Sequence, residues 1–214
     1  MEISRKFLLI GFCMVFMSCS QDRGEQAKNE KSTNDSNNQS YYKNAEFGWK
    51  IPVPNNWQIS DQDQIKTRQS KSKKESEESL EQEIDISEAK NLLGFERDKF
   101  NVFLAVAEPF KEEFDGQFEE QISANRHFSI QHYLRNAFKA EASEVEMEEI
   151  GGLTFRKYSI QLFSPDGNLI LKQIVYGRLI NGYHFGVRMD YNNEELGREM
   201  LEAWRSSEFK PSQE

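Results

Sequence analysis

The sequence contains little of what would cross-link a small domain or bind a metal ion. Among its 214 residues there are only two cysteines, three histidines and five prolines. Basic residues are also fewer than acidic ones, 27 Lys and Arg against 36 Asp and Glu, so the net charge is −9. Because a protein binds nucleic-acid phosphates through a basic surface, this balance argues against nucleic acid as the main partner.

The composition nevertheless predicts a folded core. Hydrophobic residues make up only 37% of the sequence, but aromatic residues make up 12% and include 16 Phe, which a disordered chain would lack. The length fits one domain with some unstructured sequence attached, at about 100–200 residues per domain. We therefore expect a single folded core, with very polar stretches in other parts of the sequence.

The first eighteen residues have the pattern of a signal peptide. Arg5 and Lys6 give a positive start, and residues 7–17 form a run of eleven without charge. This run is too short to cross a bilayer, which takes about 20 apolar residues. Its length suits the apolar segment of a signal peptide.

The charge-free run is followed directly by Ser18-Cys19. A small residue before a cysteine at this place resembles the lipobox of bacterial lipoproteins, although Phe16-Met17 departs from the usual pattern. The resemblance implies that residues 1–18 are removed and that acyl chains on Cys19 hold the protein on a membrane of the cell envelope, at its periplasmic face or in the outer membrane. The alternative is an ordinary secretory signal with an incidental thiol. Since Cys13 would leave with the signal, a lone exported thiol would remain, and this favours acylation.

Residues 19–41 have the composition of a flexible linker. Positions 20–40 contain a single aliphatic residue, Ala27, and no aromatic residue. Such a segment buries too little apolar surface to offset the entropy of ordering. As a coil of about 21 residues it would reach roughly 25 Å, which is enough to hold a folded domain off a membrane.

Residues 42–211 are predicted to form one domain with a charged excursion at 61–78. In residues 47–53 apolar side chains alternate, which predicts a half-buried strand. Positions 61–80 contain only Ile65 and Leu80 as apolar residues, so we expect an exposed segment with a solvated face. A narrow apolar stripe predicts a helix over 78–93.

The middle of the chain predicts one central strand and one helix. Residues 101–107 are apolar on both faces, which is typical of a strand covered on both sides. Residues 124–139 read as a helix with Ser123 as its cap and Ile130, Leu134, Ala137 and Phe138 as its inner face. Between them, an apolar side chain recurs every four residues, and this stripe predicts either a short helix or a flap over a cavity. Its members are Phe110, Phe114, Phe118 and Ile122.

The C-terminal half predicts a β-meander followed by a helix. Strands are expected at 144–148, 153–163, 169–180 and 183–191, separated by the turn pairs Gly151-Gly152, Asp166-Gly167 and Asn181-Gly182. The final helix covers 193–206, with Asn192 or Asn193 as its cap. The expected fold class is α+β, in α/β/α layers, with a mainly antiparallel twisted sheet of about six or seven strands flanked by helices.

Two stretches resemble the PsbP-like or Mog-type fold, which includes DcrB-like bacterial lipoproteins. The first runs from Tyr42 through Phe47-Gly48-Trp49 to Trp57. The second is the ending, from Gly152 and Phe155 through the two later turn pairs to Trp204 and the segment 206–209. Members of this group act mainly as non-catalytic accessory, assembly or partner-binding subunits, so the resemblance implies such a role.

Candidate residues for chemistry are few. His127 and His132 are five apart and would point about 140° away from each other on a helix, so they cannot share a metal. His184 lies on the more polar face of its strand, near Arg188 and Asp190, but no recognisable nucleophile accompanies it. Glu144, Glu146 and Glu148 could attract Ca²⁺, yet such sites need oxygens from several segments, and a solvated strand face is favoured. We expect no cofactor and no metal.

Three functions stay open at this point. The first is a lipid-anchored envelope protein whose domain binds or assembles with a protein partner without catalysis, using a surface around Phe110, Phe114, Phe118 and Ile122. The second is a carrier of a small apolar ligand, with the same side chains as a lid. The third is a hydrolase built around His184.

Overall fold

The computed structural model describes residues 40–61, 63–67, 70, 73–74, 77 and 87–210. Residues 1–39, with the expected signal peptide, Cys19 and most of the linker, lie outside this part of the chain. Positions 78–86 of the expected helix also lie outside it. These expectations therefore stay predictions.

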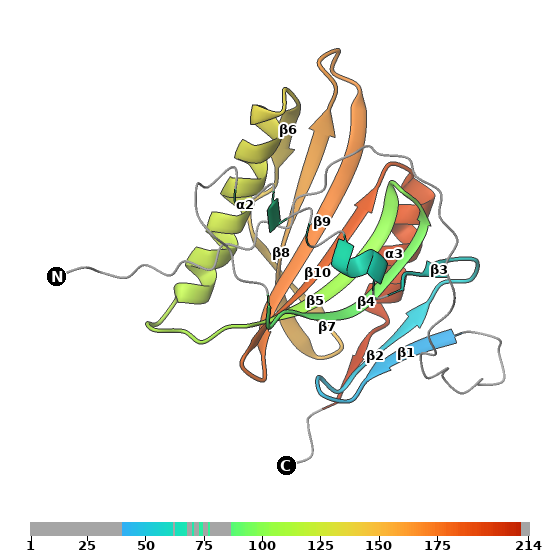
Figure 1. The fold of residues 1–214 in the computed structure, drawn as a ribbon, viewed down its shortest axis with the longest axis vertical. Helices are drawn as coiled ribbons and strands as arrows, with labels where there is room; N and C mark the ends of the chain where they lie inside the picture. Colours follow the sequence, from blue (N-terminus) through green and yellow to red (C-terminus); the bar gives the residue numbers. More distant parts are fainter. Residues whose placement is uncertain are drawn as a thin grey trace.

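An antiparallel sheet of eight strands forms the centre of the described domain (Figure 1). Its strand order is β3-β4-β5-β10-β9-β8-β6, and β7 also pairs with β8. The strands are β3 (Gln58–Ile59), β4 (Lys90–Asp98), β5 (Asn101–Pro109), β6 (Lys139–Ala142), β7 (Glu146–Ile150), β8 (Leu153–Phe163), β9 (Leu169–Ile180) and β10 (Tyr183–Tyr191). The α+β class and the meander β7-β8-β9-β10 are confirmed.

Two of the three predicted turn pairs of the meander form two-residue turns, whereas Asp166-Gly167 lies within the longer connection 164–168 between β8 and β9. Gly151 and Gly152 both have positive φ, as do Asn181 (φ 51°) and Gly182 (φ 77°). Two successive positive φ values are the requirement of a type I′ hairpin turn, which matches the right-handed twist of the strands that it joins. Each pair therefore fixes the register of its hairpin, with Ile150 opposite Leu153 and Ile180 opposite Tyr183.

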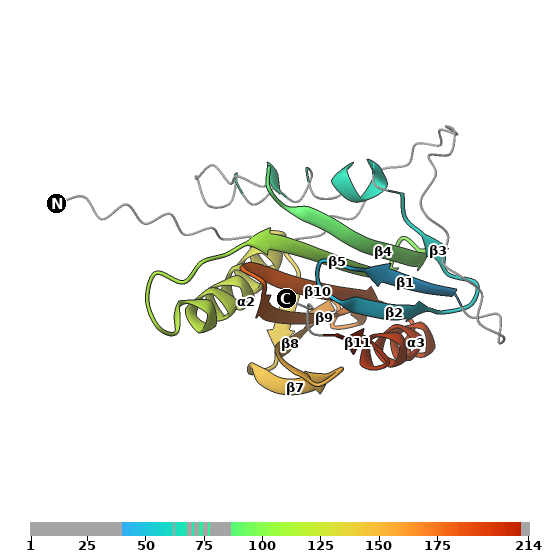
Figure 2. The same ribbon diagram turned by 90° about the horizontal axis from the view of Figure 1, so that it is seen from below.

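A second sheet of three strands has the order β1-β2-β11. It consists of β1 (Ser40–Asn44), β2 (Trp49–Val53) and β11 (Glu208–Phe209). Helix α3 (Glu194–Arg205) precedes β11, and Asn193 caps it by accepting hydrogen bonds from the backbone N–H groups of Glu195 and Leu196 at 2.9 and 3.2 Å. Figure 2 shows this sheet and α3 on one side of the large sheet, with the helical residues 63–67 on the other.

The main core lies between the large sheet, the small sheet and α3. It is rich in aromatic rings, and Trp49, Phe185 and Trp204 are almost wholly buried there. The ring of Trp49 meets that of Phe185 edge-on at 5.1 Å between centroids, a favourable arrangement for aromatic pairs. Trp49 and Trp57 therefore act as core residues. A second cluster, which includes Phe118 and Tyr158, lies beneath α2.

Two expectations about residues 61–93 are wrong in part. Residues 90–93 belong to strand β4 and not to a helix, because Leu92 and Leu93 are buried within the sheet. Residues 63–67 of the charged excursion are helical, and Ile65 is 1% exposed against Val102 and Leu104. The burial of this one apolar side chain packs the helical segment 63–67 against the sheet.

Helix α2 differs from the expected one in its limits and in its inner face. It covers Gln117–Arg135, with Gly116 at its N-cap position, whereas the expected helix began after Ser123. Leu134 is 45% exposed, although it was expected to face inward. Within the described residues, no helix is both long enough and apolar enough to span a membrane.

Candidate functional site

The face of the large sheet that lies under α2 carries five polar side chains, of which all but His184 are buried. Residues that are directly opposite on neighbouring strands point to the same face. Glu108 on β5 is opposite His184 on β10, and Gln173 on β9 is opposite Asp190 on β10. Because side chains on one strand alternate between faces, Arg188 shares the face of His184 and Asp190. Five polar residues of three strands are thereby placed together.

Helix α2 turns a matching polar stripe toward this face. Its residues Gln121, Asn125, Ser129 and His132 are all buried, and they recur at intervals of three or four, so they lie on one side of the helix. Gln121 donates from Nε2 to Oδ1 of Asn125 at 2.9 Å. The hydroxyl of Ser129 donates to the backbone carbonyl of Asn125, also at 2.9 Å.

A small cavity separates the helix from the sheet. Its volume is about 50 Å³. Asn125 and Ser129 contribute to its wall from α2, and Glu108, Gln173 and His184 from the sheet, together with apolar neighbours such as Ile122. A water molecule needs roughly 10–15 Å³ and two to four polar partners. The cavity can therefore hold a few water molecules, but it has no room for a substrate of ordinary size.

Two ionisable groups of the cavity wall, Glu108 and His184, are held in their neutral forms. Burial raises the pKa of the Glu108 carboxyl to about 8, because a carboxylate is poorly solvated in an apolar surrounding. Burial likewise lowers the pKa of His184 to about 4. Near neutral pH the site therefore carries a carboxylic acid and a neutral imidazole side by side.

The His184 ring is fitted closely between apolar neighbours. It meets the Phe118 ring edge-on at 5.1 Å between centroids. A Cβ atom added at Gly177 would lie 2.9 Å from Nε2 of His184 and 2.7 Å from Cδ1 of Ile122. The missing side chain of Gly177 is thus what makes room for this ring.

The arrangement does not form a catalytic triad. A nucleophile and its base must lie within hydrogen-bond reach, and the base must be oriented by a third group. Among the described residues, no hydrogen bond joins His184 to Glu108 or to Ser129, and the Ser129 hydroxyl is bonded to its own helix. The environment of His184 explains its altered pKa without a catalytic role.

At one end of the polar face lies a buried ion pair. Nε of Arg188 is 3.0 Å from Oδ2 of Asp190, and both side chains are at most 5% exposed. Gln173 donates from Nε2 to Oδ1 of Asp190 at 2.8 Å. The Asp190 carboxylate is therefore contacted from two strands, through an ion pair with Arg188 of β10 and a hydrogen bond from Gln173 of β9, and a buried charge requires such partners.

The stripe that was expected to form a surface or lid is mostly buried. Phe118 and Ile122 are each 2% exposed; they are the first inward residues of α2 and part of its core. Phe110 is partly buried and packs on Phe118 at 5.7 Å between ring centroids. Only Phe114, at 48%, is exposed. The stripe is therefore not one surface, because half of it belongs to the core.

The lid hypothesis also finds no support here. Ile122 lines the cavity under α2, but Phe114 and Phe118 do not. An apolar cavity that binds benzene measures about 150 Å³, which is about three times the volume found here. The space is too small for the carrier function as it was expected.

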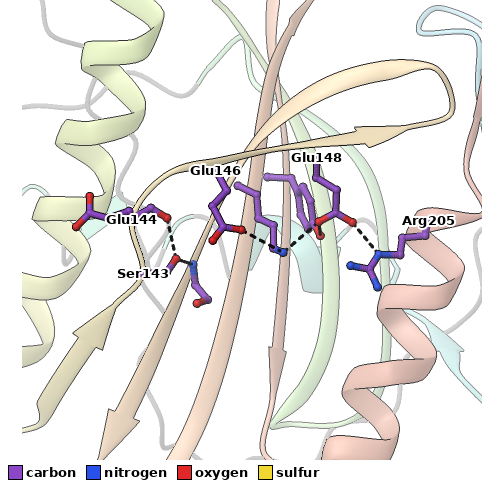
Figure 3. Close-up of polar contacts among 8 residues, drawn as sticks. Ser143, Glu144, Glu146, Glu148 and Arg205 are labelled. Atoms are coloured by element: carbon purple, nitrogen blue, oxygen red, sulfur yellow. Dashed lines mark hydrogen bonds and ion pairs between the residues drawn. The ribbon is translucent and has the colours of Figure 1, made fainter.

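Glu146 and Glu148 of β7 are ion-paired with cationic side chains of the protein (Figure 3). Glu148 lies 2.7 Å from Nε of Arg205 and 3.1 Å from Nζ of Lys157, and it accepts a hydrogen bond from the Tyr176 hydroxyl at 2.9 Å. Its pKa is lowered by Arg205, Lys157 and Tyr176 against the opposing effect of burial. Among the described residues, no group of three or more His, Cys, Asp or Glu could hold a metal ion. The contacts of Glu148 fasten α3 to β7 and β8.

The sequence indicated the setting of His184 but not the site as a whole. The shared face of His184, Arg188 and Asp190 follows from alternation and is confirmed. Glu108 and Gln173 were not recognised, because each occurs once in a strand that is otherwise mainly apolar. Glu108 could have been found from its position in the strand. It shares a face with Leu104 and Val106, and because the strand was expected to be covered on both sides, a carboxyl on that face would be buried.

Comparison with known proteins supports the fold. No family model matches the sequence, and no curated protein matches it. One solved structure that it resembles is the solution structure of cyanobacterial PsbP (CyanoP) from Synechocystis sp. PCC 6803, with a TM-score of 0.54 over 84% of this chain and 98% of that chain. The sequence identity is 8%. The fold is therefore PsbP-like, and at this identity the similarity concerns the fold alone.

Proposed function

We propose that the chain is a lipid-anchored protein of the bacterial cell envelope whose PsbP-like domain is a non-catalytic accessory or assembly module that binds a protein partner. The observation that carries the proposal is the small size of the polar cavity under α2. Its volume of about 50 Å³ leaves no room for a substrate, and its histidine has no nucleophile within hydrogen-bond reach among the described residues. Enzymes place such groups in clefts that a substrate can enter.

The accessory role is consistent with the group that the sequence resembles. Members of the PsbP-like group act mainly as partner-binding or assembly subunits, and the fold of this chain is that of the group. Phe114, exposed by 48% and preceded by Glu112 and Glu113, is the part of the expected surface that a partner could reach. An exposed aromatic side chain is a frequent anchor in protein interfaces.

The anchor is tested by metabolic labelling with an alkyne fatty acid in a Gram-negative host. The chain offers a matched pair of variants, since it contains only Cys13 and Cys19. We expect label on the wild type and on Cys13→Ala, and none on Cys19→Ala. Label that survives Cys19→Ala, or is lost in Cys13→Ala alone, would overturn the anchor.

The accessory role is tested by photo-crosslinking in intact cells of the natural host. A photoreactive phenylalanine at position 114 should give a discrete cross-linked band, and the same residue at Leu134, which is exposed by 45% at the other end of α2, serves as the control. The band should persist in a His184→Gln background, because the site is not catalytic. If the band at position 114 matches that at position 134, the proposed surface is incorrect.

A further inference from the structure

The small sheet has one buried face and one charged face. Trp49 and Ile51 point into the core and are at most 1% exposed. Lys50 lies between them and points outward, directly opposite Lys43 of β1 on one side and Glu208 of β11 on the other. Lys210 follows two residues after Glu208 and is exposed.

This outer face is locally basic in a chain that is acidic overall. Nζ of Lys50 lies 2.8 Å from Glu208, and the pKa of Glu208 is lowered by this contact first and also by the charges of Lys210 and Lys43. Three lysines thus surround one carboxylate, while the whole chain carries −9. Glu46, in the turn between β1 and β2, forms an ion pair with Lys90 of β4.

The basic face brings two lysines of neighbouring strands together, in addition to the ion pair between Lys50 and Glu208. Lys43 and Lys50 are directly opposite each other, and like charges in that position destabilise a sheet. Lys50 also lies 4.5 Å from the centroid of the Tyr41 ring on the same strand as Lys43. Lysines near a membrane surface are attracted to anionic lipid headgroups, and tyrosine is enriched at the headgroup level of membranes.

The chain enters the domain at this sheet. Ser40, the first residue of β1, follows Cys19 by 21 residues. The linker expected from the sequence would reach roughly 25 Å, so a domain held at Cys19 would be able to bring β1 to the bilayer. The excess negative charge of the rest of the chain disfavours contact with anionic lipid through other faces.

We propose that the outer face of the three-stranded sheet, with Lys43, Lys50 and Lys210, rests on the anionic headgroups of the membrane to which the chain is tethered. This inference rests on the proposed lipid anchor and adds to it the orientation of the domain. α2 and the exposed Phe114 are not part of the three-stranded sheet. They therefore stay available to a protein partner when that sheet rests on the membrane.

The orientation is tested with the acylated full chain on two kinds of vesicle, phosphatidylcholine alone and an equimolar mixture with phosphatidylglycerol. Lysines are acetylated briefly, and the rates are compared by mass spectrometry. We expect Lys43 and Lys210 to react several-fold more slowly on the anionic vesicles and to recover in high salt. Lys139, on the edge strand β6 with a side chain that is 65% exposed, should react equally on both.

Charge-reversal variants sharpen the test. Lys43→Glu combined with Lys210→Glu should remove the lipid-dependent difference in reaction at Lys50, whereas Lys139→Glu should keep it. Each lysine near an anionic surface strengthens binding by about fivefold. A thermal unfolding transition that is retained in all variants shows that the domain stays folded.

Each result bears on one claim. If the chain fails to float with phosphatidylcholine vesicles, the lipid anchor is wrong, while the lysine rates on anionic vesicles still decide the orientation. Equal rates on both vesicles would overturn the orientation. Protection that occurs in native membranes but not on anionic vesicles would also overturn it and would assign this face to a protein.

Discussion

The two faces of the eight-stranded sheet are built on different principles. The face toward α3 is filled with aromatic rings, and Trp204, at its centre, is 0% exposed. The face toward α2 places Glu108, Gln173 and His184 around a cavity. The first face gains its stability from close packing, whereas the second depends on whether each buried polar group is satisfied. Changes in side-chain volume should therefore affect stability most on the face toward α3, whereas changes in pH should affect it through the face toward α2.

The largest effect is expected on the aromatic face. Trp204→Ala should lower the free energy of unfolding by about 3–5 kcal/mol, because the indole contacts the rings of Phe155, Tyr176 and Phe185 and nothing can fill the space that it leaves. Denaturant unfolding followed by circular dichroism measures the loss. The control is Leu134→Ala on the exposed side of α2. A loss below about 1 kcal/mol for Trp204→Ala would contradict the view of this face as densely packed.

The second effect has the opposite sign and lies on the polar face. The pKa of Glu108 is raised from 4.5 to about 8, so the native state holds a proton that the unfolded chain has lost. Stability linked to this group is therefore fully present below pH 4.5 and declines as the pH rises toward 8. Glu108→Gln keeps the shape without the charge and should stabilise the domain by roughly 2–4 kcal/mol at pH 8.

The measurement for Glu108 is a series of denaturant curves between pH 4.5 and 8. The variant should flatten the decline that the wild type shows in this range. Glu149→Gln, at an exposed position of β7, is the matched control and should leave the decline unchanged. An identical decline in the wild type and in Glu108→Gln would mean that Glu108 is already charged in the folded protein at neutral pH.

The contrast between the faces also explains which parts of the fold could be predicted. The aromatic face, the meander and the turn pair Asn181-Gly182 follow from alternation and from the φ > 0 that such turns require. The inner face of α2 could not be found in this way. Prediction assumes that buried faces are apolar, and Gln121, Asn125 and Ser129 break that assumption. They face inward because the sheet opposite them is polar, and this pairing is a tertiary property.

Tertiary contacts also explain the two segments whose secondary structure or exposure was predicted wrongly. Leu92 and Leu93 fit a helix as well as a strand when only local spacing is considered. Their pairing with β5 decides for the strand. Ile65 is a single apolar residue in a charged segment, and its burial depends on a patch formed by Val102 and Leu104, which lies far away in sequence.

A third prediction concerns the acid side of the pH range. Burial lowers the pKa of His184 from 6.5 to about 4, so the unfolded chain takes up a proton in this range before the native state does. Stability linked to His184 is therefore present above pH 6.5 and is lost as the pH falls toward 4. His184→Gln should reduce this loss by about 1–3 kcal/mol. His127→Gln, at an exposed position of α2, should not, and urea curves at pH 7 and pH 4 distinguish the two variants.

The smallest expected effect comes from adding a methyl group at two glycines of the polar face. Gly177 and Gly186 are directly opposite each other on β9 and β10, yet an added methyl group meets different surroundings. At Gly186 the nearest atoms would be 3.7 Å or more away, which is ordinary contact, whereas at Gly177 they would be 2.7 and 2.9 Å away. Gly186→Ala should therefore stabilise the domain by about 0.5–1 kcal/mol, and Gly177→Ala should destabilise it by about 1–3 kcal/mol.

This pair of variants tests the cavity directly, because each substitution adds the same group to the same wall from a neighbouring strand. If the space under α2 is real, thermal unfolding will show opposite shifts in the two proteins. Equal destabilisation by both would mean that α2 already rests on the sheet at Gly186. In that case the neutral state of Glu108 and His184 would have to come from contact with apolar atoms, since no room would be left for water.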